Sequence, residues 1–127
     1  MALSIAKFDS VIIPHTIISE TVLSGNGGGA ATVDTDMTQG DSGSLLSVDI
    51  HNSWATKVYL HITLTDTSPT NATEADILIP AAGSSRLLFT VPQGIPFSSL
   101  SMWATTSSTA ATTTAPSGDV IVTLITT

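Results

Sequence analysis

The chain has 127 residues, of which ten are acidic and only three are Lys or Arg, so the formal net charge at pH 7 is −7. Charged residues make up 10% of the chain, against about a quarter in an average soluble domain. Three scattered cations, Lys7, Lys57 and Arg86, are too few to neutralise a phosphate backbone or to form a basic membrane-surface helix. We therefore expect neither a nucleic-acid partner nor a membrane partner.

Polarity comes mainly from hydroxyl groups, because the chain contains 21 Thr and 17 Ser. Hydrophobic residues account for 42% of the sequence, which is enough for the core of one domain. Cysteine is absent, which excludes a disulfide scaffold and a Cys nucleophile. The first residues contain Lys7 and Asp9 and lack a basic region followed by an apolar run, so we expect no secretory signal and folding in the cytosol.

The N-terminal third combines short β-branched runs with flexible, polar segments. The runs occupy 11–13, 17–18 and 22–23, and Pro14 separates the first two. A Gly-rich stretch and an acidic stretch follow, up to residue 44. We predict that residues 1–44 form an extended arm of one to three strands that leads into a compact domain at 45–127.

Strict alternation of apolar and polar residues predicts β-strands throughout the compact domain. The last strand is apolar on both faces, which predicts a central position or cover by a partner. No segment has helical spacing with caps. The alternating apolar positions are Val48 and Ile50; Val58, Leu60, Ile62 and Leu64; Ile77 and Ile79; Leu87, Phe89 and Val91; Leu100, Met102 and Ala104; and Val120, Val122 and Leu124.

Turn-forming residues separate the predicted strands. Residues 66–71 and 81–84 are predicted to be loops. The prolines in 92–96 predict a rigid crossing segment, because proline lacks the backbone donor that a sheet needs. The Thr-, Ser- and Ala-rich segment 105–118 predicts a long hairpin loop between the last two strands. This pattern predicts an all-β fold, an antiparallel β-sandwich of immunoglobulin-like or jelly-roll type, with the immunoglobulin-like count preferred.

Two short motifs suggest chemistry that the surrounding sequence does not support. Residues 40–44 resemble the nucleophile segment of trypsin-like proteases, but only His15 precedes Ser42 and the upstream chain is too short for that fold. Residues 25–30 match a loose dinucleotide fingerprint, yet no helix is predicted to begin there. Both segments are interpreted as loops, and we expect no enzyme and no cofactor.

Metal binding is also not expected, although two groups of possible ligands occur. Asp34, Asp36 and Asp41 could gather around Ca²⁺, but their spacing departs from the EF-hand pattern and favours an acidic turn. If residues 48–52 and 58–62 formed a hairpin, Asp49 would lie across from His61. Nothing fixes a third ligand for zinc, so the histidines are interpreted as surface residues.

Large amphipathic aromatic residues are few. Trp103 shares a strand with predicted core residues, so packing is its expected role. Trp54 lies in the predicted turn 51–57, and an exposed Trp is typical of an interface. Trp54 and Tyr59 are therefore the candidate residues for a protein interface or a glycan contact.

The order of features at 45–127 resembles a small β-sandwich module of tailed-bacteriophage virion proteins, found in head-decoration and fibre-type components. The similarity covers about two-thirds of the chain and rests on order and composition. It is carried by residues 45–52, 58–62, the Pro69 loop, 77–84, 92–97, a strand ending in Thr105-Thr106, a loop with Pro116, and 120–122.

This resemblance implies a non-enzymatic structural protein of a virus particle. We expect a capsid decoration, or cement, protein that is assembled in the host cytoplasm and stabilises the phage head. Its expected partners are the major capsid protein or other virion proteins, and shell symmetry suggests a homotrimer. The alternatives are a tail or head fibre module that binds host glycans through Trp54, Tyr59 and the 105–118 loop, or a pilin-like surface subunit. The shortage of charge fits an assembly subunit, since charged edges normally prevent strand-to-strand association.

Overall fold

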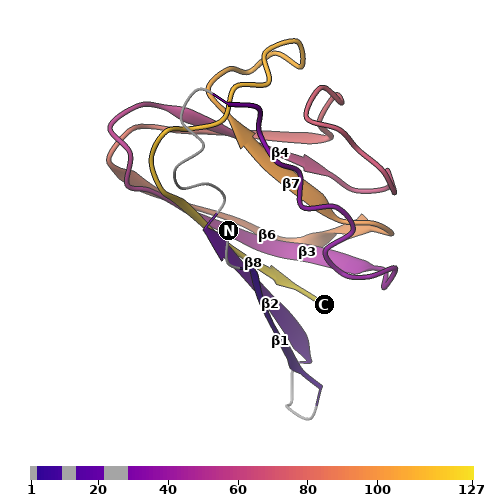
Figure 1. The fold of residues 1–127 in the computed structure, drawn as a ribbon. Helices are drawn as coiled ribbons and strands as arrows, with labels where there is room; N and C mark the ends of the chain where they lie inside the picture. Colours follow the sequence, from indigo (N-terminus) through magenta and orange to yellow (C-terminus); the bar gives the residue numbers. More distant parts are fainter. Residues whose placement is uncertain (1–2, 10–13, 22–28) are drawn as a thin grey trace.

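The computed structural model describes residues 3–9, 14–21 and 29–127. These residues form eight strands and no helix, arranged as two antiparallel sheets (Figure 1). The predicted all-β class is confirmed, and the two sheets are consistent with a β-sandwich.

One sheet has five strands and the other has three. The five-stranded sheet has the order β1 (Leu3–Phe8), β2 (His15–Thr21), β8 (Val120–Thr126), β3 (Gly43–Asn52) and β6 (Ser85–Phe97). The three-stranded sheet has the order β5 (Ile77–Ala81), β4 (Val58–Thr63) and β7 (Ser101–Thr105). Because the second sheet is narrower, it leaves the outer strands of the first sheet with little cover.

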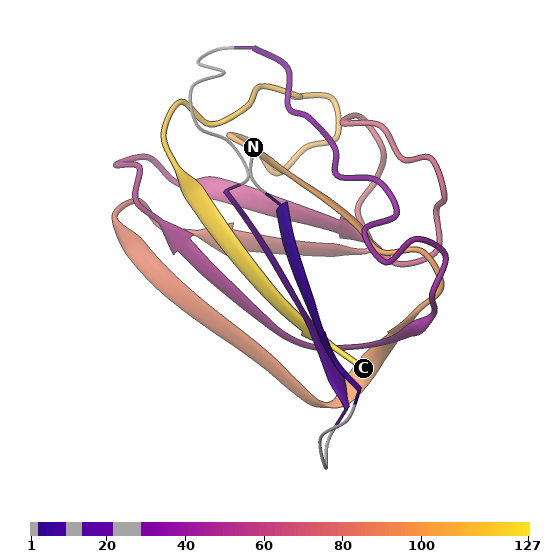
Figure 2. The same cartoon turned by 60° about the horizontal axis from the view of Figure 1, so that its bottom comes forward.

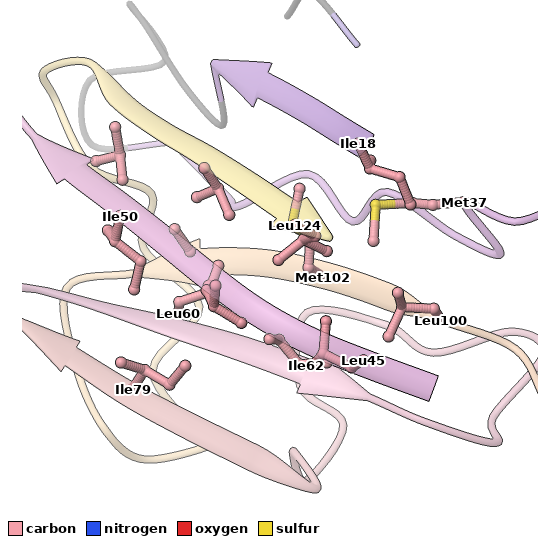
Figure 3. Close-up of a cluster of buried hydrophobic side chains, with 14 of the residues drawn as sticks. Ile18, Met37, Leu45, Ile50, Leu60, Ile62, Ile79, Leu100, Met102 and Leu124 are labelled. Atoms are coloured by element: carbon pink, nitrogen blue, oxygen red, sulfur yellow. The ribbon is translucent and has the colours of Figure 1, made fainter. Parts of the chain in front are cut away.

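The core lies between the two sheets and is built from the alternating apolar residues that the sequence indicates (Figure 3). On the five-stranded sheet, Val48 and Ile50 of β3 are fully buried. On the three-stranded sheet, Leu60 and Ile62 of β4 are fully buried opposite them. Alternation with period two places these side chains on one face of each strand, so burial follows directly from the pattern.

The segment expected to be an arm contributes two described strands to the five-stranded sheet. β1 pairs with β2, and β2 pairs with β8. Ile18 of β2 and Met37 both belong to the core (Figure 3). β8 lies between β2 and β3 in the sheet, whereas Ile121 on its outer face is 37% exposed, so cover of both faces stays a prediction. The runs at 11–13 and 22–23 lie outside the described residues.

Two predicted connections are wrong. The 92–96 segment continues β6 instead of crossing between sheets, and Pro96 pairs with Ser44 of β3. Proline is tolerated there because β6 is an edge strand, where one side of the backbone needs no ladder partner. The 105–118 loop does not form a hairpin, because β7 and β8 belong to different sheets. Pairing partners distant in sequence decided both outcomes.

Residues 29–37 run along the free edge of β7 and cover it. Asp34 and Met102 exchange two backbone hydrogen bonds, with N–O distances of 2.9 and 3.1 Å. The Met37 amide donates to the Leu100 carbonyl at 2.8 Å. Above the outer face of β7, Ala31 and Ala115 pack against Trp103 in a small second cluster. All five residues of β7 are therefore buried.

Candidate functional site

All six residues of the edge strand β1 are exposed. Leu3, Ile5 and Phe8 are 44%, 40% and 38% exposed. The described contacts of β1 are its pairing with β2, a stack of Phe8 on His15, and one ion pair. Each of these apolar residues keeps more than a third of its surface in water, and covering that surface with another molecule would be favourable.

The opposite edge of the same sheet is β6, and it is also apolar and uncovered. Leu87, Leu88 and Phe89 are consecutive and are 37%, 64% and 39% exposed. Register places Leu87 and Phe89 beside the core residues Ile50 and Val48 of β3. β6 forms the edge of its sheet, as its ribbon in Figure 2 shows. Both edges of the five-stranded sheet thus expose large hydrophobic side chains.

A cleft of about 480 Å³ is lined by residues of β1, β2 and the loop at 37–42. Its lining mixes hydroxyl-bearing and charged residues with apolar ones. Thr126 contributes to the lining, is 1% exposed, and has no hydrogen-bond partner for its Oγ1 among the described residues. The lining residues are Ile5, Lys7, Asp9, Thr16, Met37, Thr38, Gln39, Asp41, Ser42, Phe97, Thr126 and Thr127.

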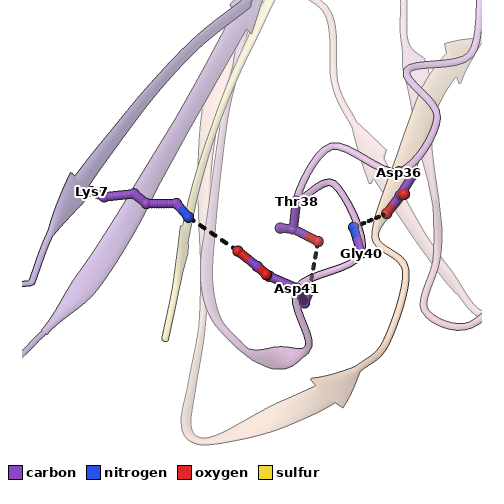
Figure 4. A network of polar contacts seen from close by, with 5 residues as sticks. All are labelled: Lys7, Asp36, Thr38, Gly40 and Asp41. Atoms are coloured by element: carbon purple, nitrogen blue, oxygen red, sulfur yellow. Dashed lines mark hydrogen bonds and ion pairs between the residues drawn. The ribbon is translucent and has the colours of Figure 1, made fainter.

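The loop beside this cleft is held by local polar contacts (Figure 4). Lys7 reaches across from β1 to Asp41, with an Nζ–Oδ2 distance of 3.1 Å. The Thr38 hydroxyl donates to the Asp41 carbonyl at 2.8 Å, and the Gly40 amide donates to Asp36 Oδ1 at 3.0 Å. Positive φ angles of 54° at Gln39 and 84° at Gly40 reverse the chain there. The Lys7–Asp41 pair is mostly exposed, so it contributes little to stability.

The three aspartates considered for Ca²⁺ have different surroundings. Asp36 Oδ1 accepts from Gly40 and from Ser99, while Asp41 pairs with Lys7. Asp34 is half-buried, and burial raises the pKa of its carboxyl group to about 6. Across the described ranges, no group of three His, Cys, Asp or Glu side chains is placed to hold a metal ion.

The predicted neighbourhood of Asp49 and His61 is wrong, because β3 and β4 lie in different sheets. Asp49 instead pairs with Arg86, with Oδ–N distances of 3.1 and 2.7 Å, and this hydrogen-bonded ion pair lowers the pKa of Asp49. His51 is exposed as expected, whereas His61 is only 3% exposed. Surface location was therefore the wrong interpretation for His61.

His61 belongs to the layer that covers the outer face of the three-stranded sheet. Its ring stacks on Trp103, with a centroid distance of 5.1 Å. His61 Nε2 lies 2.8 Å from Thr105 Oγ1, whose own hydrogen is donated to the Ser107 carbonyl. Nε2 therefore carries a proton and donates to Thr105. Burial lowers the pKa of His61, which keeps the ring neutral near pH 7.

The candidate aromatic residues lie on different sides of the three-stranded sheet. Trp54 is half-buried, packs against the core, and sits on Gly118, where an added Cβ would lie 2.6 Å from its ring. Tyr59 is half-buried on the opposite face of β4 from Val58 and Leu60, with Lys57 Nζ 5.4 Å from its ring centroid. The two rings do not form one stacking platform. A glycan contact at either ring stays a prediction.

Sequence reasoning missed both uncovered edges. The signal was present in Leu87-Leu88-Phe89, since three consecutive apolar residues cannot all face one core in a strand. In β1 the signal was weak, because Leu3 and Ile5 alternate like core residues. Whether such residues are covered depends on the width of the facing sheet, which no local pattern encodes.

Comparisons with protein-family models, with curated proteins and with solved structures found no match for this chain. In the part of the chain that the structure describes, no helix is long and apolar enough to cross a membrane.

Proposed function

We propose that this chain is a structural protein of a virus particle, which decorates the capsid and stabilises it through protein–protein contacts. The observation that carries the proposal is the pair of uncovered apolar edges on the five-stranded sheet. Monomeric sheet proteins usually guard their edges with charge, proline or bulges, because an open edge is a template for association. β1 carries Lys7, and the prolines of β6 lie at its far end, yet the two strands expose six large hydrophobic residues: Leu3, Ile5, Phe8, Leu87, Leu88 and Phe89.

We also propose that the sandwich is a jelly roll, in preference to the immunoglobulin-like type. The eight strands of the roll are β2, the 30–37 segment, and β3 to β8 in chain order. The first pairs with the last and so on inward: β2 with β8, the 30–37 segment with β7, β3 with β6, and β4 with β5. This nested pairing is what an antiparallel hairpin produces when it is rolled up. Jelly rolls are common in viral capsid domains, which supports the proposal by analogy of fold.

The high content of Thr and Ser also supports a role in assembly. Thr and Ser suit strand surfaces and lose little side-chain entropy when another protein covers them. Ser42 lines the cleft beside Lys7, and no histidine is among the lining residues of that cleft. The proposed partners are the major capsid protein and other copies of this chain.

The test is to delete the gene and compare particles with and without the protein. We expect intact heads that lose their contents at lower temperature or lower internal pressure, and labelled protein distributed over the head surface. Restoring the wild-type gene should rescue stability, whereas the Ile5→Lys variant should rescue it poorly. Labelled protein found only at tail tips would overturn the decoration role.

A fibre module that binds glycans is the second candidate, favoured by the hydroxyl-lined cleft. Thr16, Ser42 and Thr126 supply hydroxyls, and Asp41 supplies a carboxylate, which are groups that hydrogen-bond sugar hydroxyls. A glycan array should then show binding that Ser42→Val weakens. The matched variant Trp54→Ala separates this cleft from the aromatic residues as the binding site. No signal above background with the wild-type protein would remove the candidate.

A further inference from the structure

We propose that β6 is the contact between two copies of this chain, through antiparallel pairing of residues 85–91 with the same residues of a second copy. The pairing joins two five-stranded sheets into one continuous sheet across a two-fold axis. This inference deepens the proposed function, because it names the edge by which copies associate. It also specifies which edge remains for other virion proteins.

β6 offers a free edge for this pairing. Among the described strands, β6 is the last of its sheet and pairs with β3 alone, so no described strand pairs with the other side of its backbone. Residues 86–90 are all exposed. Leu88 points to the outer face of the sheet and is 64% exposed, the highest value among the large hydrophobic residues described as exposed. A second strand would cover backbone and side chains together.

Residues 85–91 of β6 also lack the features that normally block strand pairing. Residues Ser85–Thr90 follow β3 in unbroken register, and the only irregularity recorded between these strands lies further along, between Leu45 and Ser47. The prolines of β6 begin at Pro92. Arg86 is the only charged residue of β6, and Asp49 already neutralises it. The stretch is therefore regular, apolar and open.

Electrostatics also favour β6. Two copies of a chain with a net charge of −7 repel each other, so a self-contact needs a surface without unpaired acids. None of the ten acidic residues lies between Asp76 and Asp119 in sequence, and Asp49, which lies opposite Leu88 on β3, is paired with Arg86. β1, by contrast, is followed at once by Asp9 and faces Asp41 through Lys7. Charge thus favours β6 as the contact between like copies.

The register follows from self-complementarity. With Leu88 on the two-fold axis, Leu87 of each copy lies opposite Phe89 of the other, and Arg86 lies opposite Thr90. Directly opposite residues of an antiparallel pair share one face of the sheet. The two Leu88 side chains therefore meet on the outer face, while the Leu87 and Phe89 pairs meet on the inner face. No charge faces a like charge in this arrangement.

The size of the contact sets the expected affinity. One edge of seven residues is smaller than a standard interface, which buries about 800 Å² on each partner. We therefore expect a dimer that forms at micromolar concentrations. A two-fold contact favours this dimer over the trimer that shell symmetry alone suggests, and it leaves β1 free for a different partner.

The absence of cysteine makes a direct test possible. In the predicted register the two Leu88 Cα atoms are about 4.5–5.5 Å apart, which is within the range of a disulfide. Mild oxidation of Leu88→Cys should convert most of the protein to a covalent dimer. The control Leu78→Cys, on the edge strand β5 and 40% exposed, should stay monomeric. A third variant, Ala6→Cys, reports on β1.

Efficient cross-linking at Ala6 with none at Leu88 would overturn the inference, and so would equal cross-linking at Leu78 and Leu88. Sedimentation of the unmodified protein gives an independent measurement. We expect a dimer that Leu88→Lys dissociates at least tenfold more readily, with an unchanged circular dichroism spectrum. A trimer, or a monomer at millimolar concentration, would reject the β6 contact. Neither result touches the decoration role, which the gene deletion tests separately.

Discussion

β7 and β1 are short strands of similar size and meet opposite environments. Every residue of β7 is buried, whereas every residue of β1 is exposed. β7 is a sheet edge by strand order, yet residues 29–37 close its free side and Trp103 is covered by Ala31 and Ala115. Nothing comparable among the described residues covers β1. The chain thus seals one edge with its own loops and leaves the edges of the other sheet open.

This contrast indicates that exposure of β1 and β6 is not a general consequence of a small sandwich. Loop residues of the same chain cover β7 completely. Open apolar edges are costly in a monomer, because they invite association. Their presence beside a sealed edge supports assembly as the role of the five-stranded sheet.

The largest expected effect comes from removing the side chain at the centre of the sealed layer. Trp103 is fully buried, so Trp103→Ala should lower the free energy of unfolding by about 3–5 kcal/mol, measured by urea denaturation. The matched control Leu88→Ala on the open edge should change it by less than about 0.5 kcal/mol in dilute monomer. Similar losses at the two positions would erase the distinction between the edges.

Substitutions at Glu20 would show where the exposed edge of the five-stranded sheet gives way to the buried core. Glu20 lies on β2, between exposed β1 and central β8, and is 1% exposed with no partner for either carboxylate oxygen among the described residues. An unsatisfied buried polar group costs about 1–3 kcal/mol. Glu20→Met should therefore raise the free energy of unfolding by about that amount.

The variant Glu20→Gln keeps a polar group at the same place and should gain less than Glu20→Met. Thermal melting of both variants beside the wild type would measure the order. A lower free energy of unfolding in both variants would mean that the Glu20 carboxylate has a polar partner. In that case this part of β2 would not belong to the apolar core.

A smaller, pH-dependent effect is expected from Asp34 in the segment that seals β7. Burial raises the pKa of Asp34 from 3.8 to about 6. Between these two pH values, the carboxyl group is mostly protonated in the folded state and mostly ionised in the unfolded chain. This contribution to stability is complete below about pH 4 and is lost as the pH rises through 6. Asp34→Asn should be more stable than the wild type at pH 7 by about 1–2 kcal/mol, and no more stable at pH 4.

His61, in the same sealed layer, acts in the opposite direction. Its pKa lies below 6.5 because burial disfavours the charged ring, so stability falls as the pH drops below 6.5. Urea denaturation of Asp34→Asn between pH 4 and 8 isolates the histidine contribution. A flat profile in that variant would show that His61 is accessible to water, which contradicts the sealed layer.

Much of the fold could be predicted from the alternation of residue types. The strands around Ile50, Leu60 and Val122 all bury the side chains that the pattern indicates. Trp103 was correctly predicted to pack, because it follows Met102 in a strand. These successes depend only on neighbours in sequence, since period two decides which side chains share a face.

The candidate site could be predicted only in part. Trp54 and Tyr59 are half-buried on different sides of their sheet, and the edges with Leu88 and Phe8 were not anticipated as a site. His51 and His61 both occupy polar positions in the alternating pattern of their strands. His61 is nevertheless buried, whereas His51 is exposed. No local rule distinguishes the two histidines, because the covering residues come from distant parts of the chain.

The amino-acid sequence by itself determined the all-β class, the position of most strands, the acidic and hydroxyl-rich surface, and the acid-free interval around β6. Each of these follows from residue type or from the repeat of side chains along a strand. Only the tertiary structure decided which strands share a sheet, that the prolines at 92–96 lie in an edge strand, and which edges stay open. Strand pairing is a choice between partners far apart in sequence, and its free energy depends on the packing of both sheets at once.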